Sequence, residues 1–304
     1  MSALVQRLAA ELASPAPDAV RALAARLADP ARDAAILYYG STLRTGDLSG
    51  VLDFYRLTRE PHRRGLRGLV ERVLWPEVSY HEVAVEGRVL RAKVATLPLA
   101  QFRRAAEGRT LDTTIWARFV QPTQLVWRAG PVEALAAAEA CAAAVVTAAR
   151  YAAKLGPDRG PPEAFWRALF RHTYAAEFRL ESQGRPDQVM AAAEGRYAEL
   201  LPIAWREGGV AFEARDGEVA PDKRGLPGWT LRNLAGKPLN IARLAKAAFT
   251  FEGASRYAAW KVARHTGVEL AVTPFRERHP ILAAPGAWLE LRRRRRAGRA
   301  VPKT

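Results

Sequence analysis

The spacing of apolar residues changes about 130 residues into the chain, and this change limits the fold more than any single motif. Before it, four short segments have strand-like patterns, at residues 35–39, 51–57, 80–86 and 89–96. After it, long stretches have helical spacing, beginning with an alanine-rich run at residues 132–155. We therefore expect an α+β chain in which a mixed-sheet domain precedes a mainly helical one.

Local signals add detail to this outline. Gly87 stands between two alternating segments and predicts a hairpin turn. Residues 208–228 are rich in glycine, proline and charge, which is typical of a hairpin or a linker. Further helices are expected at residues 2–13, 18–27, 63–74, 98–119, 162–181, 187–200, 241–251 and 255–265. We divide the chain into a sheet domain (1–125), a helical domain (126–215) and a basic C-terminal helical region with a tail (216–304).

The chain is strongly basic, with 47 Lys and Arg against 31 Asp and Glu, a formal net charge of +16. Such a surface favours polyanionic partners, which are nucleic acids, nucleotides or an anionic membrane. A single cysteine, Cys141, excludes a disulfide within the chain and a cysteine-based zinc site. The first residues have no long apolar run, and no segment approaches the roughly 20 apolar residues of a membrane span. We therefore expect a cytoplasmic protein that lies on any membrane it meets.

One turn and one strand acid carry the clearest chemical signal. Gly40-Ser41 follows the first short strand, and Asp53 stands on the second strand, twelve residues after the serine. A glycine turn lets phosphate oxygens approach the backbone, and a carboxylate can hold Mg²⁺ against a triphosphate. This spacing is that of nucleotidyltransferases, although their usual second acid is replaced here by Tyr55. A turn glycine and a strand-end aspartate without catalytic roles remain the alternative.

Other acids near this turn could complete a metal site. Glu82 and Glu86 are expected on one face of the third strand, where both are more often solvated side chains than ligands. Asp47 lies in the loop after the turn, where capping of the loop is the simpler role.

Several short motifs extend the signal in a fixed order. Residues 39–41 and 51–54 resemble the Y-G-S turn and M-L-D-F strand of the mitochondrial-type phosphatidate cytidylyltransferases, the translocator assembly and maintenance family. Later segments at residues 87–91, 116–122 and 173–180 are similar to that family's next motifs, in the same order. The family has one acid on the second strand, followed by an apolar residue. The resemblance covers roughly residues 35–202.

The resemblance implies a nucleotidyltransferase-like fold and a reaction of CTP with phosphatidic acid that gives CDP-diacylglycerol and pyrophosphate, with Mg²⁺. It implies metal binding by Asp53 and Glu177, and further catalytic roles for Arg118 and Arg179. Gly40, Ser41, Arg91 and Lys93 would bind the nucleotide. The chain departs from the family pattern at Ala176, at Glu177 and at Gln121, where the family has a lysine. These departures bear on lipid specificity more than on nucleotidyl transfer.

The last quarter of the chain combines basic and aromatic residues. Two helices, at residues 241–251 and 255–265, precede five consecutive arginines. Such a segment can lie on anionic headgroups. The residues predicted to bind the membrane are Arg243, Lys246, Trp260, Lys261, Arg264, Arg292, Arg293, Arg294, Arg295 and Arg296. Binding to a nucleic-acid backbone, or helices packed on the core with a disordered tail, would account for the same features.

The sequence therefore predicts a cytidylyltransferase that acts on phosphatidic acid or a related lipid phosphate, peripheral to the inner face of the membrane. Two alternatives remain open. One is a nucleotidyltransferase that acts on RNA or protein. The other is a non-catalytic nucleic-acid or membrane-binding protein with the same fold.

Overall fold

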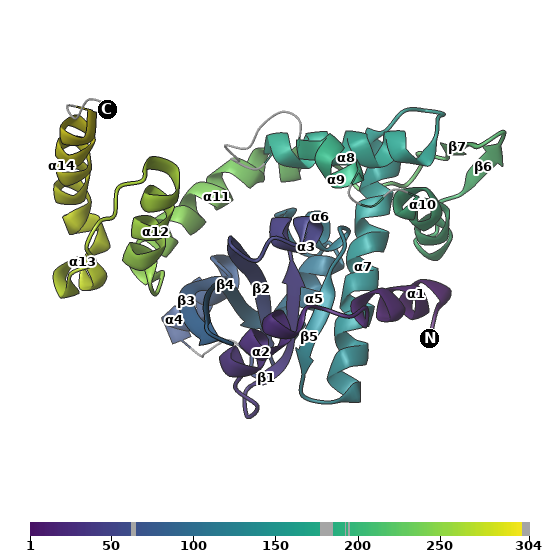
Figure 1. Cartoon of the computed structure of the whole chain (residues 1–304). Coiled ribbons are helices and arrows are strands. Elements are labelled where there is room, and N and C mark those ends of the chain that lie inside the picture. Colours follow the sequence, from purple (N-terminus) through teal and green to yellow (C-terminus); the bar gives the residue numbers. More distant parts are fainter. Residues whose placement is uncertain (62–64, 177–184, 192, 194, 300–304) are drawn as a thin grey trace.

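The structure is a computed structural model that describes residues 1–61, 65–176, 185–191, 193 and 195–299 (Figure 1). Its fold is mixed α+β, as the sequence predicts, and it contains a five-stranded mixed sheet with one strand more than the four predicted. The strand order is β3-β4-β2-β1-β5. The strands are β1 (Asp33–Tyr39), β2 (Val51–Thr58), β3 (Glu77–Val85), β4 (Arg88–Pro98) and β5 (Gln124–Arg128).

The pairing of the strands explains why the sheet is mixed. β1 pairs antiparallel with β2 and with β5, and β3 pairs antiparallel with β4. β2 and β4 are parallel, because the helix α4 (Gly65–Val73) and the strand β3 separate them in the chain. Glu86 and Gly87 both have positive φ, the geometry of a two-residue turn that follows the twist of the hairpin. The predicted hairpin is therefore confirmed.

Helices cover both faces of the sheet. One face packs against α1 (Ala3–Leu12), α5 (Leu99–Ala106), α6 (Thr114–Phe119) and α7 (Pro131–Leu155), and these elements enclose the larger core. The other face carries α2 (Asp18–Leu27) over a smaller core. Ser2 caps α1 as expected, since its hydroxyl accepts a hydrogen bond from the Val5 amide.

The long helix α7 is the alanine-rich run and forms the axis of the larger core. It packs against α1, α5 and α6 and against the later helices α8 (Pro162–Ala176) and α10 (Arg196–Glu207), and its small side chains let these neighbours approach closely. α7 is also long and apolar enough to pass a simple test for a membrane span, so the expectation that no segment comes near this length was wrong. More than half of its most apolar window is buried inside the protein, which is the arrangement of a core helix.

Further helices pack on α7. They are α8 (Pro162–Ala176), α9 (Arg185–Ala191) and α10 (Arg196–Glu207). The predicted helix at 187–200 is in fact two helices, because the chain turns at Gly195, which has a φ of +76°. The glycine-rich segment that follows is a hairpin of β6 (Phe212–Arg215) and β7 (Glu218–Pro221).

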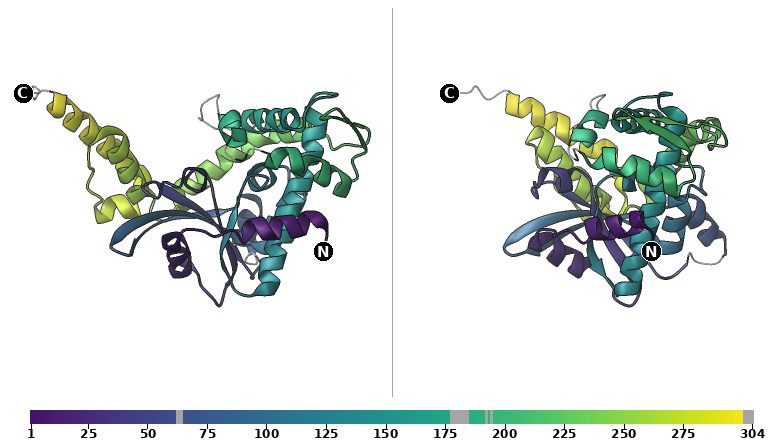
Figure 2. Two further views of the ribbon diagram at one scale, coloured as in Figure 1. Left: turned by 45° about the vertical axis from the view of Figure 1, so that its right-hand side comes forward. Right: turned by 90° about the vertical axis from the view of Figure 1, so that its right-hand side faces the viewer.

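The C-terminal quarter leaves this body as a chain of helices. α11 (Thr230–Thr250) crosses α8 and runs over the sheet to α12 (Ala254–Thr266), as Figure 1 shows. α13 (Pro274–Arg278) and α14 (Pro280–Arg299) project from the body (Figure 2). The alternative of a disordered tail was wrong for residues 290–299, because the arginine run belongs to α14.

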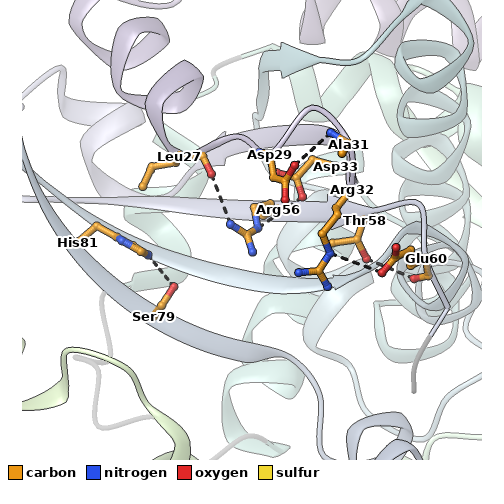
Figure 3. Close-up of polar contacts among 10 residues, drawn as sticks. All are labelled: Leu27, Asp29, Ala31, Arg32, Asp33, Arg56, Thr58, Glu60, Ser79 and His81. Atoms are coloured by element: carbon orange, nitrogen blue, oxygen red, sulfur yellow. Dashed lines mark hydrogen bonds and ion pairs between the residues drawn. The ribbon is translucent and has the colours of Figure 1, made fainter. Parts of the chain in front are cut away.

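A polar cluster ties α2 to the outer face of the sheet (Figure 3). Arg56 pairs with the buried Asp33, with 3.6 Å between Nε and Oδ1, and donates a hydrogen bond to the Leu27 carbonyl. Burial raises the pKa of Asp33, and the nearby Arg56 opposes this effect. Ser79 and His81 lie beside these groups on β3 and bond to each other. This cluster fixes the end of α2 and lies on the sheet face opposite Asp53.

The packing around α7 predicts a large effect for one substitution. Trp116 is fully buried on α6 and stacks on Tyr151 of α7, with 5.0 Å between ring centroids. Trp116→Ala should lower the free energy of unfolding by about 3–5 kcal/mol, because it leaves a cavity between the two helices. Urea titration followed by far-UV circular dichroism measures this. Trp288→Ala, at a site that is 52% exposed, is the control and should change it by less than about 0.5 kcal/mol. Similar values for both variants would contradict this packing.

Candidate functional site

The turn after β1 is built around Gly40. This residue has φ +97° and ψ −159°, a conformation that is essentially restricted to glycine. A Cβ atom at Gly40 would lie 2.8 Å from Oδ2 of Asp53. Glycine is therefore required both by the backbone and by the carboxylate that packs against it. The short helix α3 (Ser41–Thr45) follows, within the segment that the sequence predicts as a loop.

Asp53 occupies the start of β2 between two neighbouring strands. It is in register with Tyr39 on β1 and with Lys93 on the parallel strand β4. Tyr55 and Leu57 follow at alternate positions and belong to the larger core, so Asp53 projects from that same face. Lys93 and Arg91 share this face of β4 with Ala95 and Leu97. The structure thus brings together the predicted Gly40-Ser41 turn, Asp53, Arg91 and Lys93.

Arg118 reaches the same face from α6. Its Nη1 donates a hydrogen bond to the Tyr55 hydroxyl at 2.9 Å. Its guanidinium carbon lies 5.3 Å from the Tyr39 ring centroid and 5.8 Å from that of Tyr55. The two tyrosines therefore orient the arginine by a hydrogen bond and by cation–π contact. This role of Tyr55 has no signal in the sequence, because the two partners are 63 positions apart.

Gln121, at a position where the resembled family has a lysine, lies close to a cation from another element. Arg44 of α3 donates a hydrogen bond from Nη1 to Gln121 Oε1 at 3.4 Å. The Gln121 amide in turn donates to the Ala117 carbonyl. The substitution therefore links α3 to α6 and leaves a guanidinium near this position.

The structure shows the positions of the other three acids considered as metal ligands, Glu82, Glu86 and Asp47. Glu82 accepts hydrogen bonds from Arg91 Nε at 3.3 Å and from the Tyr80 hydroxyl at 3.0 Å. β3 ends at Val85 and Glu86 lies in the turn, so the expectation that Glu86 shares a strand face with Glu82 was wrong. Asp47 caps its loop by accepting two hydrogen bonds from Ser49, and these bonds lower the pKa of Asp47.

Two predicted catalytic residues, Glu177 and Arg179, lie outside the described residues. Among the residues that the structure does describe, no group of three or more His, Cys, Asp or Glu side chains is placed to hold a metal ion. Mg²⁺ usually needs one or two protein carboxylates, because substrate phosphates and waters supply its other ligands. Asp53, with its Oδ2 against the glycine turn, fits that mode of binding.

The predicted membrane residues fall into two groups. In the first, Arg243 pairs with the buried Asp112 at 3.3 Å and lies over the Trp75 ring. Lys246 donates to the Leu74 carbonyl at 2.7 Å, and burial lowers its pKa. The basic side of α11 therefore faces the protein. The opposite, apolar side is exposed at Ile241, Leu244 and Phe249.

The second group lies on the last helices. Trp260 and Arg264 of α12 face the sheet domain: the Trp260 ring centroid is 5.6 Å from the guanidinium carbon of Arg91, and Arg264 donates to the Ser49 carbonyl at 3.3 Å. Lys261 is exposed and lies over the Tyr257 ring. On α14, Arg292, Arg293 and Arg294 are exposed, and Arg294 pairs with Glu290. Arg295 and Arg296 belong to α14, and their side chains lie outside the described set.

No model of a known protein family matches the chain, and no curated protein matches it significantly.

The contact between Gly40 and Asp53 predicts unequal costs for two glycine substitutions. Gly40→Ala should lower the free energy of unfolding by at least about 2 kcal/mol, because the new methyl group meets the Asp53 carboxylate in a strained turn. Gly46→Ala is the matched control, since Gly46 also has positive φ but has nothing within 4 Å of its Cβ position. Gly46→Ala should lower the free energy of unfolding by about 1 kcal/mol. Equal costs in urea titrations would show that Asp53 does not pack on the turn.

Proposed function

We propose that this chain is a nucleotidyltransferase that transfers CMP from CTP to phosphatidic acid or a related lipid phosphate, releasing pyrophosphate. The observation that carries the proposal is the packing of the Asp53 carboxylate against the Gly40 turn, within a face that also bears Arg91, Lys93 and Arg118. One acid surrounded by cations suits a metal–triphosphate better than a free cation. The mixed sheet and the order of the motifs support a nucleotidyltransferase-like fold.

The reaction does not require a covalent bond between the protein and a substrate. An oxygen of the acceptor phosphate attacks the α-phosphorus of CTP, and the bond from that phosphorus to the pyrophosphate oxygen breaks. The acceptor phosphate is already an anion near neutral pH, so no general base is required. The protein must therefore align two anions and offset the charge on the leaving pyrophosphate. Bound Mg²⁺, held by Asp53 and the triphosphate, would supply part of that charge.

Individual side chains have distinct roles in this proposal. The Gly40-Ser41 turn receives the triphosphate, with the Ser41 hydroxyl as a ligand of its oxygens. Lys93, in register with Asp53, contributes a positive charge at the level of the metal. Tyr55 holds Arg118 in place before substrate binds, so the guanidinium group needs little reorientation during the reaction. Arg44 supplies a cation near the position where Gln121 replaces the family lysine.

The C-terminal helices support a lipid acceptor. α11 exposes Ile241, Leu244 and Phe249, the last of which is 82% exposed. A groove of about 630 Å³ between α11, α12 and α14 is lined almost wholly by apolar side chains, including Val262, Ile281 and Leu291. Exposed apolar surface beside the arginines of α14 is typical of proteins that lie on anionic bilayers. These features support the proposal that the protein lies on the cytoplasmic face of a membrane.

Transfer to RNA or protein is the second candidate. The net charge of +16 favours it, since a basic surface also attracts a nucleic-acid backbone. The exposed apolar residues of α11 favour the lipid, because two of the three, Ile241 and Leu244, are aliphatic, whereas nucleic acid is bound mainly by basic side chains and by aromatic stacking.

Replacement of the proposed metal ligand tests the chemistry. Asp53→Asn keeps the size of the side chain and removes its charge, so kcat/KM for formation of CDP-diacylglycerol should fall at least about 100-fold. Radiolabelled CTP, Mg²⁺ and phosphatidic acid vesicles provide the assay. Asp216→Asn at the tip of the β6–β7 turn is the control, since asparagine suits its positive φ. The proposed role of Asp53 is excluded if both variants retain wild-type rates.

The exposed side of α11 predicts a separate effect on membrane binding. Phe249→Asp should reduce sedimentation with vesicles of anionic lipid by at least about tenfold, because burial of a phenyl group contributes about 1.5–3 kcal/mol. Binding of CTP should be unchanged. Val132→Asp, at a site that is 75% exposed on α7, is the matched control. Strong, salt-sensitive RNA binding without vesicle binding would instead favour the second candidate.

A further inference from the structure

One side of α12 contacts the sheet domain at three successive places. The Tyr257 ring lies 5.4 Å from the Tyr80 ring on β3. Trp260 lies over Arg91 on β4, and Arg264 donates to the Ser49 carbonyl beside the start of β2. Positions 257, 260 and 264 fall on one side of a helix. This side therefore crosses from the edge strand β3 to β4 and then to the loop before β2.

The turn before α12 fixes this placement. The Tyr80 amide donates to the Glu252 carbonyl at 2.8 Å, so the chain pairs briefly with the edge strand β3. Gly253 has a φ of +77°, and a Cβ atom there would lie 2.7 Å from the Tyr80 carbonyl oxygen. Only glycine allows such close approach of the two backbones. These backbone contacts therefore fix the position of α12 against the sheet.

Two guanidinium groups meet at the Trp260 ring. The Arg91 carbon lies 5.6 Å from the ring centroid and the Arg264 carbon 5.3 Å from it. Arg91 pairs with Glu82. Arg264 donates to the Ser49 carbonyl and also lies near Asp47, whose pKa it helps to lower. Lys93 stands two positions along the same face from Arg91. Two guanidinium groups beside one ring can bind a phosphate dianion through charge-assisted hydrogen bonds.

We propose that Arg91 and Arg264, positioned by Trp260, bind the phosphomonoester group of the acceptor, so that Arg91 serves the acceptor instead of the nucleotide to which the resemblance assigns it. This inference rests on the proposed nucleotidyl transfer and names the part of the site that takes the second substrate. Arg91 is in register with Val51, two positions before Asp53, and so lies about 7 Å from the level of the metal ligand. That spacing leaves room for the α-phosphate of CTP between them.

The other side of α12 indicates a lipid as the source of this phosphate. Ala258, Ala259 and Val262 line the apolar groove of about 630 Å³. One helix thus presents cations toward the reaction site and apolar side chains toward the groove. A phosphate bound to Arg264 belongs to a molecule whose acyl chains can enter that groove or the adjoining bilayer.

Steady-state kinetics of Arg264→Gln test the inference. The KM for dihexanoyl phosphatidic acid should rise at least about tenfold, because the variant loses one charge-assisted hydrogen bond to the phosphate. The KM for CTP should stay within about twofold of the wild-type value. Arg264→Lys should recover part of the loss because it keeps the charge. Arg256→Gln is the matched control on the same helix, since Arg256 pairs with Glu277 of α13 at 3.0 Å. It should leave both KM values unchanged.

Inorganic phosphate supplies a second readout. It should inhibit in competition with the lipid in the wild-type chain, and Arg264→Gln should weaken that inhibition. An unchanged acceptor KM in Arg264→Gln, or competition of phosphate with CTP alone, would overturn the inference while leaving nucleotidyl transfer intact. If the wild-type chain transfers no CMP, the proposed function fails. Calorimetric titration with dihexanoyl phosphatidic acid then decides the phosphate site separately, since loss of binding in Arg264→Gln supports it and equal binding refutes it.

Discussion

The contact between the Gly40 turn and the Asp53 carboxylate is the constraint on which the rest of the site depends. With 2.8 Å between the Cβ position of Gly40 and Asp53 Oδ2, only glycine allows β1 to turn beside the acid. Register then places Lys93 next to Asp53, and Tyr55 follows on the same face to hold Arg118. One turn thus sets the positions of the proposed metal ligand, the cations and the entrance for a triphosphate.

Local sequence patterns predicted much of this arrangement. The turn and its two strands were predictable because a short apolar run ended by glycine, followed by a second run, favours adjacent strands. Strand β5 was missed, since five residues give little periodicity and its pairing with β1 is non-local. The link from Tyr55 to Arg118 could not be predicted, because it joins side chains far apart in sequence. The catalytic roles of Glu177 and Arg179 remain predictions, because both residues lie outside the described part of the chain.

The C-terminal helices show where an amphipathic pattern is ambiguous. The spacing of basic and apolar residues in α11 does not say which side of the helix meets the protein. The basic side does, because Asp112 and the Leu74 carbonyl offer partners for Arg243 and Lys246. The apolar side is left for another surface. In α12 the aromatic and basic side meets the sheet for a similar reason, and it brings Arg264 toward the site.

A crystal structure with CTP and Mn²⁺ tests the central claim most directly, because Mn²⁺ replaces Mg²⁺ and is located by its anomalous scattering. We expect the metal beside the Asp53 carboxylate and the triphosphate at the Gly40-Ser41 turn, with its α-phosphate toward Lys93 and Arg118. The side of the α-phosphate that faces Arg264 should be open to the acceptor. A metal bound away from Asp53, or a triphosphate bound away from the turn, would contradict the proposed nucleotidyl transfer at this site.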